Sequence, residues 1–223
     1  MTWDEYATAW SALHGGFDPR RSSLFVRGWL RLAFLLGRPL GRLGVPPTAV
    51  TVTGLLICGC VPLVVLADRT VGPLAAAVLV LVAGVADSVD GAVAVTSGRA
   101  TRLGHLYDSV ADRLGEACWL AAFWAAGAFG WLVVVAGGLS WLHEYVRARA
   151  TVAGMHEIGV VTVGERPSRV SIALVGLLLT GAGALLAPEL AAGTATLVTV
   201  VWVLFAGYGL CQLLAAVRRA LVR

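Results

Sequence analysis

The sequence predicts an all-α integral membrane protein in which six transmembrane helices follow an amphipathic helix at the membrane interface. The 223 residues are 58% hydrophobic and only 13% charged, with a mean hydropathy of +0.83, whereas soluble domains carry about 25% charged residues. The apolar runs are continuous over about 20 residues and lack the alternation of barrel strands. Helices are therefore the structure that satisfies their backbone groups in a bilayer.

Residues 1–47 are expected to form a cytoplasmic segment that contains the interfacial helix. Between residues 20 and 42, arginines are interleaved with bulky apolar residues. The arginines are Arg20, Arg21, Arg27, Arg31, Arg38 and Arg42, and the apolar residues are Leu24, Phe25, Trp29, Leu32, Phe34 and Leu35. This pattern is typical of a helix that lies in the interface with its arginines toward anionic lipid. A merely basic tail is the alternative.

Residues 48–217 are expected to form a six-helix transmembrane catalytic domain, with a cytoplasmic tail at 218–223. Six runs are long enough to cross a bilayer. They are Thr48–Ala67, Val71–Asp90, His105–Ala126, Trp131–Ala150, Ser168–Ala187 and Gly193–Val217. A polar connection at 151–167 separates the fourth run from the fifth.

The distribution of arginine predicts the orientation of the chain. With six spans, both termini lie on one side, and that side carries most of the arginines while the other carries only Arg69. The positive-inside rule then places both termini in the cytoplasm, with the chain in the plasma membrane. The net charge of +4 thus reflects orientation, and no nucleic-acid partner is expected.

Four aspartates near the cytoplasmic ends of the second and third spans are the strongest sign of function. An ionised carboxylate at membrane depth costs at least about 2.5–3.5 kcal/mol, so Asp87, Asp90, Asp108 and Asp112 need a partner. Their spacings of three and four place each pair on one helix face. An all-oxygen set suits Mg²⁺ or Mn²⁺, and Mg²⁺ held by carboxylates usually also binds substrate phosphates, which implies a pyrophosphate.

The spacing of these acids resembles a known signature. The chain reads Asp87-x2-Asp90-Gly91-x2-Ala94-Val95-x8-Gly104-x3-Asp108-x3-Asp112. It is similar to the pattern D-x2-D-G-x2-A-R-x8-G-x3-D-x3-D of the CDP-alcohol phosphotransferase (CDP-alcohol phosphatidyltransferase) family, and the six-span layout also looks like that family. Gly91 and Gly104 carry no side chains, so a phosphate can approach the backbone there.

The resemblance implies a phospholipid-synthesising transferase that moves a phosphatidyl group from CDP-diacylglycerol to an alcohol and releases CMP. Asp87, Asp90 and Asp108 would be metal ligands, and Asp112 would complete the metal site and act as general base. The implied CDP-binding residues are Asp87, Asp90, Gly91, Ala94, Gly104 and Asp108. The family also leads us to expect a homodimer.

The chain departs from the signature at Val95, where the family usually has arginine. The departure puts in doubt one stabilising contact near the nucleotide or the phosphates. Arg99 and Arg102 lie in the same loop and could supply the missing charge. We treat this as a hypothesis.

Several arginines suggest that the acceptor alcohol is itself phosphorylated. The candidates are Arg147, Arg149, Arg166 and Arg169, in stretches similar to bacterial phosphatidylinositol phosphate synthases. Arginine binds phosphate through a bidentate fork. Inositol phosphate is the first expectation for the acceptor and glycerol 3-phosphate the second. The alternative is that these are ordinary positive-inside arginines.

Other interpretations stay open at this point. The four aspartates could form buried salt bridges with Arg113, Arg99 and Arg102. Glu116 and Glu144 could line the pocket or pair with nearby arginines. A cation transporter also carries intramembrane acids, and a family member could have lost catalysis.

Overall fold

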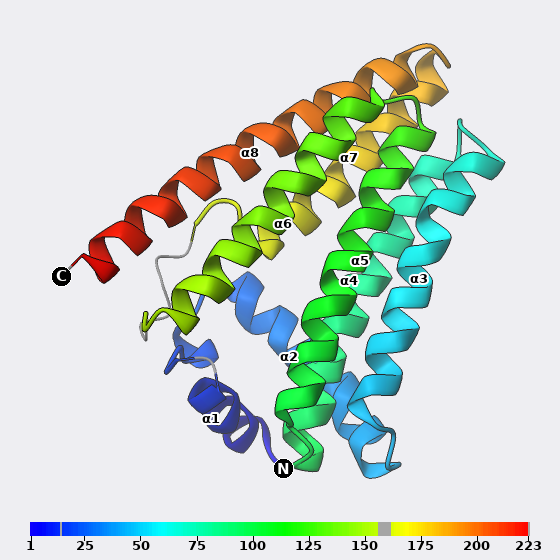
Figure 1. The fold of residues 1–223 in the computed structure, drawn as a ribbon. Helices are drawn as coiled ribbons and strands as arrows, with labels where there is room; N and C mark the ends of the chain where they lie inside the picture. The colour runs from blue at the N-terminus through cyan, green and yellow to red at the C-terminus, as the bar shows by residue number, and fades with distance from the viewer. Residues whose placement is uncertain (14, 156–161, 223) are drawn as a thin grey trace. The chain divides into compact units, whose positions relative to one another are not determined.

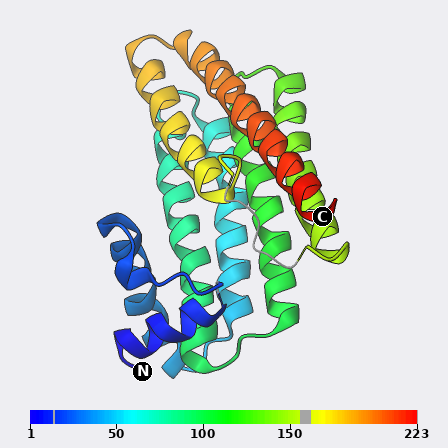
Figure 2. The ribbon, with the colours of Figure 1, turned by 90° about the vertical axis from the view of Figure 1, so that its left-hand side faces the viewer.

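The computed structural model describes residues 1–13, 15–155 and 162–222, and these residues form helices without any strand (Figures 1 and 2). The elements in order are α1 (Trp3–Leu13), the 3₁₀ helix η1 (Pro19–Arg21), α2 (Leu24–Arg42), α3 (Pro47–Ala67), α4 (Gly72–Ser97), α5 (Arg102–Ala125), α6 (Gly130–Val152), α7 (Arg166–Leu186) and α8 (Leu190–Leu221). Part of the predicted polar connection, residues 156–161, lies outside the described residues, as does the last residue of the predicted tail.

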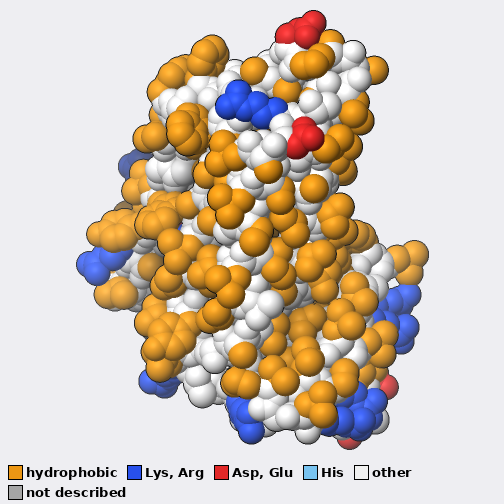
Figure 3. Space-filling view, turned by 90° about the vertical axis from the view of Figure 1, so that its right-hand side faces the viewer, with side chains coloured by type: hydrophobic (Ala, Val, Ile, Leu, Met, Phe, Trp, Pro, Cys, Tyr) orange, Lys and Arg blue, Asp and Glu red, His pale blue; other side chains and the backbone are white. Residues whose placement is uncertain are grey.

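Six long helices, α3 to α8, cover the six predicted spans. Four of them, α3, α4, α7 and α8, are long and apolar enough to cross a membrane. The other two, α5 and α6, carry acids and arginines within their length, which lowers their hydropathy, so their crossing stays a prediction. Hydrophobic side chains cover most of the face drawn in Figure 3, as expected of a surface that faces lipid. The protein is a multi-pass membrane protein.

The chain divides into two units, and the division falls within α3, α4 and α5. Unit 1 comprises Met1–Ile57 and Val82–Asp112, and unit 2 comprises Cys58–Leu81 and the chain from Arg113 onward. The four signature aspartates therefore belong to unit 1. The arginines predicted to bind the acceptor belong to unit 2.

In unit 1, α2 is the amphipathic helix predicted from the arginine pattern. Ser23 caps its N-terminus by accepting a hydrogen bond from the backbone N–H of Val26. Its inner face is buried, whereas Leu24 and Phe25 are 76% and 78% exposed. Exposed apolar residues on an arginine-rich helix fit a position in the membrane interface, although that position itself stays a prediction.

The buried face of α2 packs against the C-terminal half of α4, and the two helices run parallel. The indole Nε1 of Trp29 donates a 2.7 Å hydrogen bond to Ser88 Oγ. Further along, a Cβ added to Gly37 would lie 2.7 Å from Ala92 Cβ, and one added to Gly41 would lie 2.9 Å from Thr96 Oγ1. Glycine at these two positions lets the helices approach closely. As a result, α2 lies directly along the part of the signature that α4 carries.

α1 joins this contact through a set of apolar side chains that we call the aromatic cluster. It consists of Tyr6, Ala33, Phe34 and Ala92, with Trp3, Trp10 and Val95 packed against it. The Tyr6 and Phe34 rings lie 5.1 Å apart, and the Trp3 ring lies 6.0 Å from Phe34, within the usual range for aromatic pairs. Burial raises the pKa of Tyr6 to about 12.

In unit 2, α7 and α8 lie side by side (Figures 1 and 2), and small residues allow the contact. A Cβ on Gly176 would lie 2.3 Å from Val198 and 2.9 Å from Phe123, so only glycine fits there. The buried Trp202 donates a 3.0 Å hydrogen bond to Ser140 Oγ on α6. These contacts hold α6, α7 and α8 together around a polar centre.

Candidate active site

Three of the four signature aspartates converge in unit 1. Asp87 on α4 and Asp108 and Asp112 on α5 each offer a carboxylate oxygen, and these oxygens all lie within 4.8 Å of one another. Oxygens on opposite sides of one bound Mg²⁺ are about 4.2 Å apart, since each lies about 2.1 Å from the metal, so a small inward movement of these side chains would let them share one ion. The three side chains are half-buried, and their all-oxygen donor set suits a divalent cation that remains open to a substrate.

Asp90 is placed differently from the other three. It is only 6% exposed, and its Oδ2 accepts a 2.6 Å hydrogen bond from Thr51 Oγ1 on α3. It is outside the group of three converging carboxylates. The hydroxyl of Thr51 orients the Asp90 carboxylate, as groups that hydrogen-bond to metal ligands commonly do. The role of Asp90 as a ligand stays a prediction.

The two signature glycines leave space beside these carboxylates. A Cβ added to Gly91 would meet nothing within 4 Å, and one added to Gly104 would meet only Thr101 Oγ1, at 3.1 Å. Gly91 follows Asp87 by four residues, so both lie on the same face of α4. That face is open next to the carboxylate, which is the geometry that a bound phosphate requires.

The loop arginines considered as substitutes for the signature arginine are exposed. Arg99 donates a 3.1 Å hydrogen bond from Nη1 to the carbonyl oxygen of Gly44, between α2 and α3. Arg102 is the first residue of α5. Val95 itself packs against the aromatic cluster. The hypothesis that Arg99 and Arg102 supply the missing charge stays a prediction.

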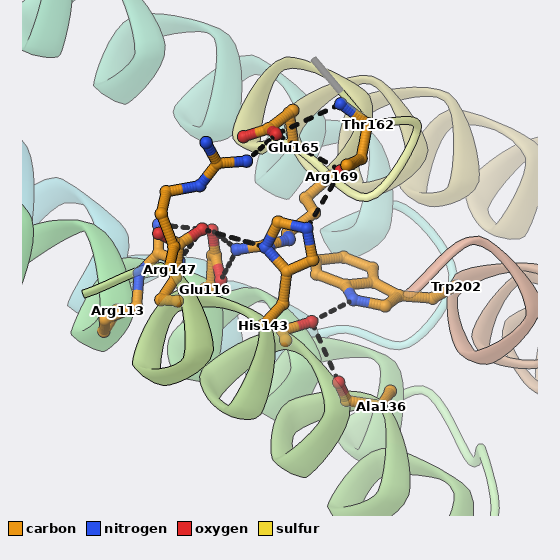
Figure 4. Close-up of polar contacts among 11 residues, drawn as sticks. Arg113, Glu116, Ala136, His143, Arg147, Thr162, Glu165, Arg169 and Trp202 are labelled. Atoms are coloured by element: carbon orange, nitrogen blue, oxygen red, sulfur yellow. Dashed lines mark hydrogen bonds and ion pairs between the residues drawn. The ribbon is translucent and has the colours of Figure 1, made fainter. Parts of the chain in front are cut away.

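Unit 2 contains a second polar constellation, formed by Glu116 and Arg113 on α5, Glu144 on α6 and Arg169 on α7, which we call the charge quartet (Figure 4). Arg169 Nη1 donates to both carboxylate oxygens of Glu116 at 3.1 Å, and its Nη2 donates to Glu144 at 3.1 Å. Arg113 pairs with Glu116 at 2.9 Å and with Glu144 at 3.0 Å. The quartet is neutral overall, which makes its burial tolerable.

A chain of hydrogen bonds leads from the quartet to the segment that precedes α7. The fully buried His143 on α6 lies 3.4 Å from Arg169 Nη2 through Nδ1, and 2.9 Å from Thr162 Oγ1 through Nε2. The same Nδ1 atom also lies 3.6 Å from Glu144 Oε1, so His143 connects two members of the quartet to Thr162. Thr162 in turn donates to Glu165, which also pairs with Arg147 (Figure 4).

The four arginines predicted to bind the acceptor phosphate thus have different surroundings. Arg169 is 2% exposed and held by two glutamates, and Arg147 is paired with Glu165. Arg149 is exposed, and Arg166 is half-buried at the start of α7. A guanidinium has five N–H donors, so a salt bridge leaves Arg147 and Arg169 further donors. Their role in acceptor binding stays a prediction.

Sequence reasoning left the function of Glu116 and Glu144 undecided, and in the structure both pair with arginines. It did not find Thr51, His143 or Thr162. The signal available for Thr51 and His143 was a polar residue within an apolar run, which usually marks a satisfied buried group and only sometimes a functional one.

Comparisons with known proteins agree with the signature. The sequence model of a family described as CDP-alcohol phosphatidyltransferase matches residues 45–208. An archaetidylinositol phosphate synthase of Pyrococcus horikoshii is 29% identical over 147 residues, covering 64% of this chain and 74% of that protein. A phosphatidylinositol phosphate synthase of Mycolicibacterium smegmatis is 32% identical over 154 residues, covering 63% of this chain and 67% of that protein.

Solved structures share the fold. The crystal structure of a Mycobacterium tuberculosis phosphatidylinositol phosphate synthase with CDP-DAG bound aligns with a TM-score of 0.62 and 25% identity, over 82% of this chain and 94% of that one. A structure of the same enzyme in complex with manganese and citrate aligns with a TM-score of 0.65 and 24% identity, over 83% of this chain and 88% of that one. The second likeness bears on the fold alone.

Proposed function

The chain belongs to the CDP-alcohol phosphatidyltransferase family, and we propose that it joins CDP-diacylglycerol to the hydroxyl group of inositol phosphate. In this reaction the phosphorus of the phosphatidyl group forms a bond to the acceptor oxygen. Its bond to the bridging oxygen of the pyrophosphate breaks, and CMP leaves with that oxygen and the bonding electrons. The acceptor hydroxyl loses its proton.

The observation that carries this proposal is the convergence of Asp87, Asp108 and Asp112 beside an open glycine face. Asp87 and Asp108 would hold divalent metal, Mg²⁺ or Mn²⁺, together with Asp90, which Thr51 orients. A bound cation would neutralise the pyrophosphate and stabilise the departing CMP. Within the signature, Gly91, Ala94 and Gly104 would form the surface against which the CDP moiety lies. The other CDP-binding residues would be Asp87, Asp90 and Asp108.

Asp112 would accept the proton of the attacking hydroxyl. It lies on α5 one turn after Asp108, and its carboxylate converges with those of Asp87 and Asp108, so it would complete the metal site and take the proton of a hydroxyl bound beside it. A carboxylate positioned within hydrogen-bond reach of the acceptor contributes about 10²–10⁴-fold to the rate as a general base.

Inositol phosphate is favoured as acceptor because the relatives are named archaetidylinositol phosphate synthase and phosphatidylinositol phosphate synthase. The arginines of unit 2 offer the means to bind its phosphate. Arg149 is the most accessible candidate, because its side chain is exposed. Arg147, Arg166 and Arg169 already interact with other groups of the protein and would add their remaining N–H donors. Glycerol 3-phosphate is the second acceptor that the same arginines would suit.

The mutational test separates the assigned roles. In detergent micelles with CDP-diacylglycerol, Mg²⁺ and inositol phosphate, Asp87→Asn and Asp112→Asn should both lose CMP release. Asp87→Asn should also lose the Mg²⁺-dependent stabilisation of the protein by CDP, whereas Asp112→Asn should largely keep it. The matched control is Asp68→Asn, an exposed aspartate that caps the turn before α4, since asparagine caps equally well. Full activity in either site variant contradicts the assignment.

The acceptor is tested by offering inositol phosphate, free inositol and glycerol 3-phosphate separately. We expect CMP release with inositol phosphate and little with free inositol, because the arginines would then lack a phosphate to bind. Turnover with glycerol 3-phosphate alone would replace the proposed acceptor. No CMP release with any alcohol would contradict the proposed reaction.

We also propose that α3 to α8 all cross the plasma membrane, with both termini in the cytoplasm, and that two copies form a homodimer as is usual in the family. The topology is tested in a variant without native cysteines. Phe129→Cys, between α5 and α6, should react with an impermeant maleimide on intact cells, and Arg42→Cys should react only after lysis. Cross-linking in membranes tests the dimer.

A further inference from the structure

Val95 takes the place of the arginine usual in the signature, and its surroundings show why the chain tolerates valine there. Val95 follows Gly91 by four residues and Asp87 by eight, so it lies near the same face of α4. It packs against the aromatic cluster that joins α1, α2 and α4. An apolar side chain fits this contact, and the position no longer carries a positive charge.

A guanidinium nevertheless lies beside that cluster, and it belongs to α2. Arg38 comes one turn after Phe34, and side chains on a helix lean back toward its N-terminus. Accordingly, the Cζ atom of Arg38 lies 5.9 Å from the centre of the Phe34 ring. Phe34 and Ala92 are both members of the aromatic cluster against which Val95 packs.

The approach of α2 to α4 makes this placement firm. Gly37, next to Arg38, leaves no room for a Cβ, which would lie 3.1 Å from the backbone nitrogen of Val93 as well as 2.7 Å from Ala92 Cβ. Arg38 is therefore carried at the level of the signature segment that contains Val95. Because α2 cannot move away from α4 without losing this contact, the guanidinium of Arg38 can move only through rotation of its own side chain.

Arg38 makes few polar contacts with the rest of the protein. Among the described residues it has no hydrogen bond or ion pair, and its Nε is buried without a hydrogen-bond partner. Glu5 is an acid close enough to be influenced by its charge, but Glu5 is exposed and already accepts a 2.7 Å hydrogen bond from Thr2 N–H. A half-buried guanidinium with so few partners is suited to an anionic ligand.

We propose that Arg38 replaces the absent signature arginine and binds a phosphate of the CDP moiety of the donor. The inference rests on the proposed function for the identity of the donor. It makes Arg38 a substrate-binding residue contributed by α2, so that the positive charge is kept near the signature although α4 no longer carries it. The stacking on Phe34 would hold the guanidinium in place before the donor arrives.

The test compares Arg38→Gln with Arg42→Gln, an arginine one turn further along α2 that is exposed. For Arg38→Gln we expect the KM for CDP-diacylglycerol to rise about ten- to a hundredfold, the range for losing a charged hydrogen bond, with the KM for inositol phosphate unchanged. The thermal stabilisation of the protein by water-soluble CDP and Mg²⁺ should fall in parallel. Arg42→Gln should change neither quantity.

Two further variants guard against a merely structural effect. Arg38→Lys should recover part of the loss, because it restores the charge without the fork. Adding Val95→Arg to Arg38→Gln should also recover CDP binding, because the charge returns to its usual helix. If Arg38→Gln lowers the melting temperature but leaves both the KM for the donor and the CDP response unchanged, the residue is structural and the proposal is wrong.

The remaining outcomes distinguish this proposal from the function on which it rests. An effect of Arg38→Gln that appears only with anionic lipid, and not with soluble CDP in neutral micelles, would assign Arg38 to lipid headgroups and overturn the proposal. A wild-type protein that binds CDP through Arg38 but releases no CMP would refute the proposed reaction and support the binding role.

Discussion

The charge quartet gives the most direct test of how unit 2 is stabilised. Glu116 and Arg169 are 1% and 2% exposed and share two hydrogen bonds. Glu116→Leu leaves the buried guanidinium of Arg169 with only Glu144 as a carboxylate partner, and Arg169→Met leaves Glu116 with only Arg113. Each single change therefore gives the quartet a net charge in a medium that solvates it poorly.

Breaking a buried pair by removing one partner costs about 3–5 kcal/mol. The lower end applies here, because Glu144 is 32% exposed and Arg113 is 15% exposed, so water screens part of the unbalanced charge. For a chain of this length, 1 kcal/mol corresponds to about 2–4 °C. We therefore expect each single variant to unfold about 6–12 °C below the wild type.

The double variant Glu116→Leu/Arg169→Met should be more stable than either single variant. The remaining pair, Arg113 and Glu144, carries no net charge, and its charged atoms already lie 3.0 Å apart in the wild type. Replacing a buried ion pair by apolar residues often changes the stability little. Unfolding followed by tryptophan fluorescence in detergent measures all three, with the exposed Arg149→Met as control. Additive losses in the double variant would refute the reasoning.

Three further predictions concern close contacts. Gly37→Ala should destabilise the protein by about 1–3 kcal/mol through overpacking, because its new Cβ would clash with α4. The control is Gly28→Ala on the same helix, where a Cβ would meet nothing within 4 Å, and this change should leave the stability unchanged or raise it. Gly209→Ala should displace the segment before α7, whose backbone lies 2.5 Å from the new Cβ, and expose it to protease, whereas Gly207→Ala should not. Thr51→Val should raise the Mg²⁺ concentration needed for half-maximal activity about tenfold, because a hydrogen bond that orients a proposed ligand is lost; an unchanged requirement would contradict that role.

The sequence predicted well what depends on one helix at a time. The apolar runs located the six long helices, and the arginine pattern located α2, because helical periodicity is a local property. The all-oxygen set expected from the four aspartates is formed in part, because carboxylate oxygens of three of them, from α4 and α5, lie within 4.8 Å of one another. The separate surroundings of Asp90 depend on Thr51, 39 residues earlier, and no periodicity records which helix will face it.

The partners of charged residues were harder to predict for the same reason. Glu116 and Arg169 are 53 residues apart, and the sequence offered several arginines as partners for each acid. Val95 was recognised as a departure from the signature, but its contact with the cluster around Tyr6 depends on how α1 folds back. Such pairings are decided by tertiary packing, where the desolvation of each charge selects the partner.

The same pairing bears on whether α5 and α6 cross the membrane. Hydropathy counts each charged side chain as if it entered the bilayer alone, at a cost of at least about 2.5–3.5 kcal/mol. In unit 2, however, two acids and two arginines from α5, α6 and α7 neutralise one another, so the packed helices bring a neutral, hydrogen-bonded group instead of four charges. Three of the residues that lower the hydropathy of α5 and α6, namely Arg113, Glu116 and Glu144, are thus ones whose cost is largely offset by folding. A helix of this kind is poorly judged by its own composition, because its ability to span depends on the neighbours that complete its salt bridges.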